Sequence, residues 1–308
     1  MLAVVSNALI ILISALVLWW GAVWIVESAA RIARRLGLSE LVIGLTIVAL
    51  GTSSPEFAVT VGAALKGQGN ISVGNVIGSN IFNMGFILGG VAVVRAIATS
   101  RTMVVRDGGM LIALSLLLLL FFRDLYIARW EGMFLLALLV LYVGILLFSR
   151  ESVEEVPAGE FRWYDILRLL AGLVLVIGGG HFLVEAAVAL AYIIGVSDWA
   201  IGVTIVAAGT SAPEFAVSLV GAIRGRHGIS AGNLIGSDIF NLLGVLGLAA
   251  TIRPMTVDPS VYSSLLVLAG MVFLVVVFLM RTGWVISRWE GALLILINLV
   301  RWILDFRS

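Results

Sequence analysis

The chain has 308 residues, of which 61% are hydrophobic and 12% charged, and its formal net charge is +1. Globular domains usually carry about a quarter charged residues, so most of this chain is expected to lie in a lipid bilayer rather than in water. The absence of cysteine excludes disulfides, thiolate metal sites and cysteine catalysis, and the near-zero net charge gives no indication of a nucleic-acid partner.

Ten segments are apolar enough to be membrane-spanning helices, which need about 20 mostly apolar residues. In chain order they are Ala8–Val26, Leu41–Leu65, Ile71–Val94, Gly108–Phe122, Gly132–Phe148, Leu169–Leu190, Trp199–Ile223, Ile229–Ile252, Val261–Met280 and Trp289–Leu304. One long polar connection, rich in glutamate, divides the chain almost into halves. We therefore predict an all-α membrane protein with a first unit over 1–148, an acidic linker over 149–162 and a second unit over 163–308.

The two halves repeat each other. Gly-Thr-Ser-Ser-Pro-Glu-Phe-Ala-Val begins at Gly51, and Gly-Thr-Ser-Ala-Pro-Glu-Phe-Ala-Val begins at Gly209, 158 residues later. Gly-Asn-Val-Ile-Gly-Ser-Asn-Ile-Phe-Asn at Gly74 recurs with the same offset as Gly-Asn-Leu-Ile-Gly-Ser-Asp-Ile-Phe-Asn at Gly232. Because five spans is an odd number, the second copy must enter the membrane from the opposite side. This predicts two inverted five-helix repeats, an arrangement that many secondary transporters use for alternating access.

The basic residues predict the orientation, because cytoplasmic loops carry an excess of Lys and Arg. With the N-terminus outside, most Lys and Arg residues fall in cytoplasmic segments. The outside then holds Lys66, Arg123, Arg129, Arg253, Arg301 and Arg307. We expect a multi-pass protein of the plasma membrane with both termini outside and the linker 149–162 in the cytoplasm.

Glu56 and Glu214 are repeat-related carboxylates in the middle of apolar segments. Charged residues at this depth are costly, and they usually face a cavity or a partner. One such glutamate could be a structural hydrogen-bonding group, but two at related positions favour binding. Pro55 and Pro213 lack an N–H and disturb the helix before each glutamate, which leaves carbonyls near 49–52 and 207–210 without helical partners. Carbonyls, hydroxyls and a carboxylate form an oxygen site suited to calcium or sodium.

The second repeated motif supplies further oxygen ligands. Ser79 and Asn83 are four residues apart and therefore share a helix face, as do Ser237 and Asn241. The glycines of this motif allow helices to approach closely.

Glu27 and Glu185 are also repeat-related, but each lies near a helix end. We interpret them as snorkelling or ion-paired residues rather than ligands.

At both motifs the sequence resembles the cation/calcium exchanger superfamily, and within it the prokaryotic sodium/calcium exchangers. The resemblance covers the signatures Gly-Thr-Ser-x-Pro-Glu and Gly-Asn-x-x-Gly-Ser-x-x-x-Asn, each in two copies, and the ten-helix layout. It implies a cation-binding core formed by broken second, third, seventh and eighth helices. It also implies that the first and sixth helices slide against this core to switch access.

The resemblance implies particular ligands. Calcium would bind Glu56, Glu214 and the carbonyls of Thr52 and Thr210. Sodium would bind the same glutamates together with Ser53, Ser79, Ser211, Ser237 and the carbonyls of Ala49 and Ala207. Asn83 and Asn241 would complete the central shell.

One position bears on the coupling ion. Where some prokaryotic members carry Asp at the end of the second signature, this chain has Asn241, and its acidic residue is Asp238, opposite Asn80. The superfamily also includes proton/calcium exchangers, whose Gly-Asn-Ala-Ala-Glu-His-like signature is absent here. We therefore favour a sodium/calcium antiporter and keep a proton/calcium exchanger as the alternative.

A cation channel and a membrane-embedded enzyme are weaker alternatives. Channels usually arrange several like units around a central axis, and acid–base pairs need unlike environments, which symmetric repeats do not provide. We expect a non-enzymatic transporter that works as a monomer in lipid, without a cofactor, and that carries Ca²⁺ and Na⁺ (or H⁺) as bound ions.

Overall fold

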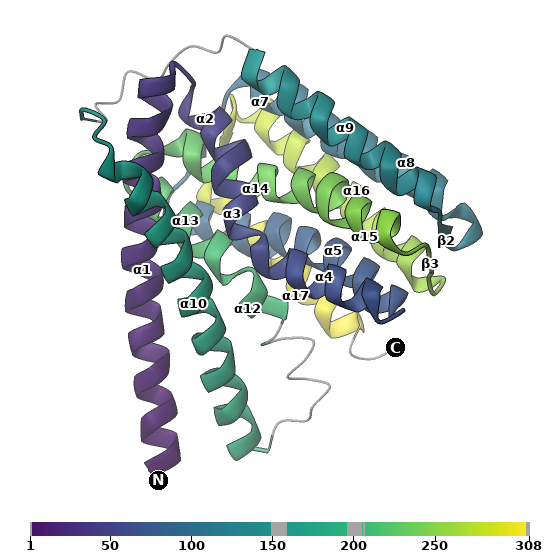
Figure 1. The fold of residues 1–308 in the computed structure, drawn as a ribbon, viewed down its shortest axis with the longest axis horizontal. Helices are drawn as coiled ribbons and strands as arrows, with labels where there is room; N and C mark the ends of the chain where they lie inside the picture. The colour runs from purple at the N-terminus through teal and green to yellow at the C-terminus, as the bar shows by residue number, and fades with distance from the viewer. Residues whose placement is uncertain (1, 149–158, 196–204, 206, 306–308) are drawn as a thin grey trace.

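The computed structural model describes residues 2–148, 159–195, 205 and 207–305 and is helical almost throughout (Figure 1). Seven described helices are long and apolar enough to cross a membrane, or eight if the bent pair Glu40–Thr52 and Ser54–Leu65 is one span. The prediction of an all-helical membrane protein is confirmed at this level. Most of the predicted linker, 149–158, lies outside the described residues.

In the first half, four helices and the bent pair are long and apolar enough to be spans, in the predicted order. Its elements are α1 (Leu2–Leu36), α2 (Glu40–Ile43), the π-helical turn η1 (Gly44–Val48), α3 (Ala49–Thr52), α4 (Ser54–Leu65), α5 (Gly69–Phe82), the π-helical turn η2 (Asn83–Ile87), α6 (Leu88–Val94), α7 (Arg101–Met103), η3 (Val104–Gly108), α8 (Gly109–Phe121), η4 (Phe122–Asp124) and α9 (Arg129–Phe148). Helix α1 is far longer than its predicted apolar stretch and ends just before Gly37, whose φ of +68° suits glycine.

The second half follows the same plan where it is described. Its elements are α10 (Tyr164–Ile193), α12 (Ala207–Thr210), α13 (Ala212–Ile223), α14 (His227–Phe240), the π-helical turn η6 (Asn241–Val245), α15 (Leu246–Ile252), α16 (Ser260–Arg281) and α17 (Arg288–Asp305). The start of the predicted seventh span lies mostly outside the described residues. The predicted tenth span, α17, does not reach the apolar composition of the other spans, since charged residues lie at both of its ends.

The second and seventh spans break where the prolines predicted. Ser53 (φ −78°, ψ 11°) separates α3 from α4, and Ser211 (φ −90°, ψ 10°) separates α12 from α13. The two parts of the second span are bent by 52°. The prediction of broken third and eighth spans needs correction, because Gly69–Val94 and His227–Ile252 are each continuous. Each contains a π-helical turn instead, which changes the local hydrogen bonding without interrupting the helix.

Contacts between the loops recur at repeat-related positions. Strand β1 (Ile97–Ala98) pairs antiparallel with β4 (Val285–Ile286), and β2 (Tyr126–Ile127) pairs with β3 (Met255–Thr256). Each half also sends one arginine to a helix end of the other half. Arg95 donates to the carbonyl of Ile223 (2.8 Å), and Arg253 donates to the carbonyl of Leu65 (3.0 Å). These contacts join the two halves at repeat-related positions.

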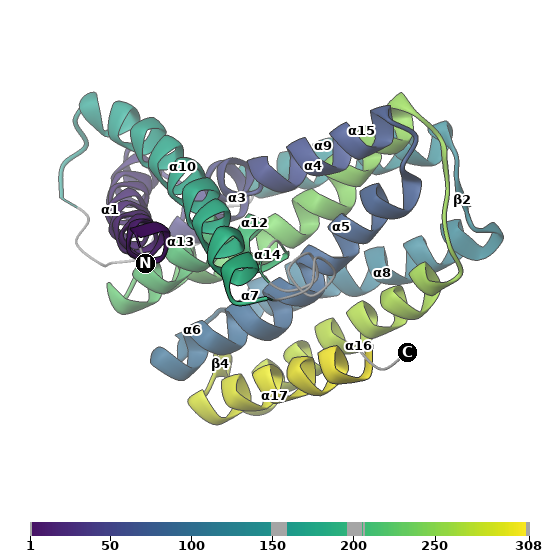
Figure 2. The same cartoon turned by 90° about the horizontal axis from the view of Figure 1, so that it is seen from below.

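Helices α1 and α10 lie side by side on one flank of the bundle (Figures 1 and 2). They approach closely because glycines face each other. A Cβ added to Gly21 would lie 2.9 Å from the carbonyl oxygen of Gly172. Close packing of small residues is the usual basis of helix association in a bilayer, where lipid tails are as apolar as leucine.

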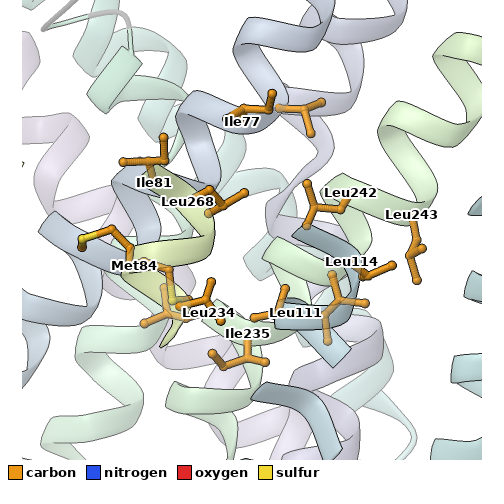
Figure 3. Close-up of a cluster of buried hydrophobic side chains, with 14 of the residues drawn as sticks. Ile77, Ile81, Met84, Leu111, Leu114, Leu234, Ile235, Leu242, Leu243 and Leu268 are labelled. Atoms are coloured by element: carbon orange, nitrogen blue, oxygen red, sulfur yellow. The ribbon is translucent and has the colours of Figure 1, made fainter. Parts of the chain in front are cut away.

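The remaining spans surround a separate apolar cluster, shown in Figure 3. Ile77 and Ile81 of α5, Leu234 of α14 and Leu268 of α16 all belong to it, and all four are nearly inaccessible. The molecule thus consists of the α1–α10 pair and a larger helical body, which contains the predicted binding residues.

A candidate cation-binding site

The two predicted glutamates lie at the breaks of the second and seventh spans. Glu56 is in the first turn of α4 and Glu214 is in the first turn of α13, and their exposed fractions are 1% and 0%. Such positions suit carboxylates, because a helix N-terminus carries partial positive charge.

Serines cross between the halves to meet these carboxylates. The Ser53 hydroxyl donates to Oε1 of Glu214 and the Ser211 hydroxyl donates to Oε1 of Glu56, both at 3.0 Å. Each glutamate is therefore oriented by the serine of the other half, and neither half can form this arrangement by itself.

The π-helical turns contribute a second pair of crossed contacts. Nδ2 of Asn83 donates to Oδ1 of Asp238 (2.9 Å), and Nδ2 of Asn241 donates to Oδ1 of Asn80 (3.2 Å). The Asn80 amide also donates to the backbone carbonyl of Asp238 (2.9 Å). Asp238 thus occupies the position that an asparagine holds in the first half, and its carboxylate replaces an amide oxygen.

The other predicted ligands are arranged less symmetrically. The Thr52 hydroxyl donates to Oδ1 of Asn233 (2.9 Å) and lies 3.4 Å from the Ser237 hydroxyl. The Ala49 carbonyl accepts the Ser53 N–H (3.0 Å). The Ser79 hydroxyl donates to the carbonyl of Asn75 on its own helix (2.7 Å). Ser79 and Ala49 therefore have local partners in this conformation.

Two predicted ligands of the second half are less fully described. Thr210 ends α12 and is half-buried. Ala207 begins α12, and its side chain lies outside the described part of the chain.

Five buried acceptor oxygens at this place have no hydrogen-bond donor among the described residues. They are Oε2 of Glu56, Oε2 of Glu214, Oδ1 of Asn83, Oδ1 of Asn241 and Oδ2 of Asp238. Leaving a buried acceptor unsatisfied costs about 1–3 kcal/mol, and a cation removes that penalty. All five atoms are oxygens, the ligand type that calcium selects. Among the described residues, no cluster of three or more His, Cys, Asp or Glu is arranged as a metal site.

Sequence reasoning missed two asparagines that position the glutamates. Nδ2 of Asn75 donates to the backbone carbonyl of Glu56 (3.3 Å) and to the Thr60 hydroxyl (2.9 Å). Nδ2 of Asn233 likewise donates to the carbonyl of Glu214 (3.2 Å) and to the Ser218 hydroxyl (3.0 Å). Both asparagines follow the first glycine of the second motif, so the repeat itself was the signal that could have identified them.

A cavity of about 440 Å³ connects the neighbourhood of the site with α10. Its lining includes Thr210 and both prolines on the core side, and His181 and Val184 on α10. This cavity separates α10 from the first turns of α4.

Glu27 forms an ion pair with Arg224 and lies 3.9 Å from Arg31, which confirms its interpretation as an ion-paired residue.

Comparison with known proteins places these features in a family. The family described as "Sodium/calcium exchanger protein" matches residues 6–148 and 164–301. CaxA, a proposed antiporter of Alkalimonas amylolytica, is 36% identical over 93% of this chain and 94% of its own length. Sodium/calcium exchanger MaX1 of Methanosarcina acetivorans is 31% identical over 94% of this chain and 95% of its own.

Similarity extends to solved structures and to a bacterial membrane protein. A structure of the sodium-calcium exchanger NCX_Mj, soaked with Na⁺ and Sr²⁺, superposes with a TM-score of 0.83 at 30% identity, covering 96% of this chain and 98% of the other. Inner membrane protein YrbG of Escherichia coli is 32% identical over 86% of both chains.

Proposed function

The chain belongs to the sodium/calcium exchanger protein family, and on this premise we propose that it exchanges calcium for sodium by alternating access at a site centred on Glu56 and Glu214. The family consists of cation antiporters, and the apolar helices make this member a multi-pass membrane protein. One observation carries the proposal. Five buried oxygens lack donors: one on each of the two glutamates, which crossed serines hold, and one each on Asn83, Asn241 and Asp238.

The proposed ligands follow the two motifs. Calcium binds Glu56, Glu214 and the carbonyls of Thr52 and Thr210. Sodium ions bind the same glutamates with Ser53, Ser79, Ser211, Ser237 and the carbonyls of Ala49 and Ala207, and Asn83 and Asn241 complete the shell. The free Oε2 atoms of the glutamates and the free Oδ1 atoms of the asparagines support this assignment. The Ser79 hydroxyl and the Ala49 carbonyl have protein partners here. Because the Ser79 hydroxyl donates to its partner, its oxygen keeps lone pairs with which it can bind sodium as well.

We propose ten spans in two inverted repeats, over 1–148 and 163–308. The paired strands support this count. Strand β1 follows the third span, and β4 precedes the tenth. Because the two strands are hydrogen-bonded to each other, their loops lie on the same side of the membrane, and an even number of spans must separate them. The same holds for β2 after the fourth span and β3 after the eighth. Both conditions are met only if α12–α13 belongs to a complete seventh span.

The proposed location is the plasma membrane, with both termini outside and the linker 149–162 in the cytoplasm. The distribution of Arg and Lys supports this orientation. The similarity to an inner membrane protein of Escherichia coli agrees with the location. We further propose that the monomer is functional in lipid, since both halves of the site come from one chain.

Proton coupling is the second candidate, and one observation favours it. Asp238 is fully buried and its Oδ2 atom has no donor among the described residues, so a proton could be carried there. If sodium is the coupling ion, Asp238→Asn should leave sodium-driven uptake largely intact, because Asn80 fills the related position. If protons are used, the variant should lose most of the pH dependence of uptake.

The test is calcium uptake into proteoliposomes under an imposed sodium gradient, a proton gradient or no gradient, with wild type and Asp238→Asn. Uptake that requires the sodium gradient is expected for both proteins. Uptake that is driven by a proton gradient without sodium would overturn the sodium assignment, whatever the variant does. Uptake without any gradient dependence would instead indicate a channel.

A further inference from the structure

Two pairs of charged residues occupy repeat-related positions on the α1–α10 pair and on the core. Glu27 of α1 and Glu185 of α10 are 158 residues apart, and so are Lys66 after α4 and Arg224 after α13. Repeat symmetry therefore relates the pair Glu27–Arg224 to the pair Glu185–Lys66.

Only one of these pairs is formed in this conformation. Arg224 donates to the carboxylate of Glu27. Glu185 and Lys66 are both exposed, and no ion pair links them to each other or to any other described residue. A carboxylate within a membrane helix normally faces water or a partner, so Glu185 is suited to a partner that this conformation does not provide.

The apolar packing beside the two pairs also differs: it is tight next to Glu27–Arg224 and open next to Glu185–Lys66. Val26 of α1 and Val217 of α13 belong to one buried cluster, and both have an exposed fraction of 0%. Their repeat partners are Val184 of α10 and Val59 of α4, which instead line the cavity of about 440 Å³. Val59 is 40% exposed. The interface between α1 and α13 is thus closed, while the related interface between α10 and α4 is open.

We propose that Glu27–Arg224 and Glu185–Lys66 are alternating latches. The first stabilises the present conformation. The second forms in the opposite conformation, when α10 packs against α4 as α1 packs against α13 here. This inference rests on the proposed exchange by alternating access, in which one bundle of an inverted-repeat transporter rocks against the other around a fixed site. Each latch joins the mobile α1–α10 pair to the end of a core helix that carries a site glutamate.

The chain contains no cysteine, so single cysteines report accessibility without background. Val59→Cys marks the open interface and Val217→Cys marks the closed one. We would measure the rate at which each thiol reacts with a maleimide in the purified protein, without added calcium. Glu27→Gln and Arg224→Gln should slow the labelling of Val59→Cys and accelerate that of Val217→Cys, each by about two- to fivefold, which is the range for an exposed ion pair.

The related substitutions should act in the opposite sense. Glu185→Gln and Lys66→Gln should leave the labelling of Val59→Cys unchanged or faster and should slow that of Val217→Cys. The charge reversal Glu27→Arg with Arg224→Glu should restore the parental rates, which separates an ion pair from general damage to the fold. Asp124→Asn, on the exposed turn η4 far from α1 and α10 (Figure 1), is the matched control and should change neither rate.

Two results would overturn the latches. One is that Glu27→Gln and Glu185→Gln shift the labelling in the same direction, and the other is that Glu27→Gln leaves both rates unchanged. Labelling requires no transport, and calcium uptake by the same cysteine variants tests the proposed function separately. If the variants label as expected but do not exchange calcium, the proposed exchange is refuted, while the two alternating latches stand.

Discussion

At the scale of single residues, the site depends on contacts that cross between the halves. Ser53 holds Glu214 and Ser211 holds Glu56, so one oxygen of each carboxylate is fixed by the protein and the other remains available. A hydroxyl that orients a carboxylate without neutralising it leaves the negative charge for the cation. In each buried glutamate, Oε1 is held by a serine and Oε2 is free to bind a cation.

Glu56→Gln and Glu214→Gln should each abolish calcium exchange without unfolding the protein. The amide keeps the shape and can still accept the serine hydroxyl, but it cannot balance a divalent ion. An attraction of about 4 kcal/mol between close charges at the effective dielectric constant of proteins corresponds to a loss of roughly 1,000-fold. Calcium uptake into proteoliposomes measures this, with Glu160→Gln as the control. Robust uptake by either buried variant would exclude the glutamates as calcium ligands.

At the scale of helices, glycine decides where the core spans meet. Helix α14 crosses the first part of the second span at Gly232 and Gly236. A Cβ on Gly232 would lie 2.8 Å from the carbonyl oxygen of Leu41, and one on Gly236 would lie 2.6 Å from the Cα of Leu45. This close approach brings Thr52 to Asn233 and Ser237. The same glycines that pack the helices therefore also place the oxygen ligands.

Gly236→Ala should lower the thermal stability of the purified protein and reduce its transport. The added methyl group meets backbone rather than a flexible side chain, and overpacking of this kind typically costs about 1–3 kcal/mol. Gly144→Ala on α9 is the control, since no described atom lies within 4 Å of its Cβ position. Thermal unfolding in detergent measures the difference. Equal midpoints for the two variants would show that the crossing can open without penalty.

At the scale of the whole molecule, the two halves have related sequences, but α1 and α10 pack differently against the core. The loop contacts follow the repeat closely, as the two strand pairs show. The α1–α10 pair does not, since it is closed against α13 and open toward α4. Under the proposed alternating access, α1 and α10 would be the pair that moves against the core.

Single cysteines in the paired loops should report the proposed topology. Tyr126→Cys and Thr256→Cys should react with a membrane-impermeant thiol reagent applied to intact cells, because β2 and β3 lie outside. Ala98→Cys and Thr282→Cys, in or beside β1 and β4, should react only after permeabilisation. All four positions are exposed. Labelling of the two members of one pair from opposite sides would contradict the ten-span count.

Much of this organisation could be predicted from local chemistry. Apolar composition indicated the membrane, and the breaks at Ser53 and Ser211 followed from Pro55 and Pro213. The expectation of a broken third span came from the family resemblance and was wrong: the sequence there has no proline, and the helix stays continuous through a π-helical turn at Asn83. Asn75 and Asn233 were missed as well, since their role depends on the carbonyl of a glutamate on another helix.

The sequence by itself determined that this is a membrane protein with two related halves and which residue types could hold a cation, because composition and repeated motifs are local properties of the chain. Only the tertiary structure decided that Ser53 meets Glu214, that Glu27 is paired while Glu185 is not, and which interface is closed. The physical reason is that two halves of like sequence favour the same two conformations. Each contact between the moving pair and the core is therefore possible twice, and only the packing of the whole chain decides which copy of it forms.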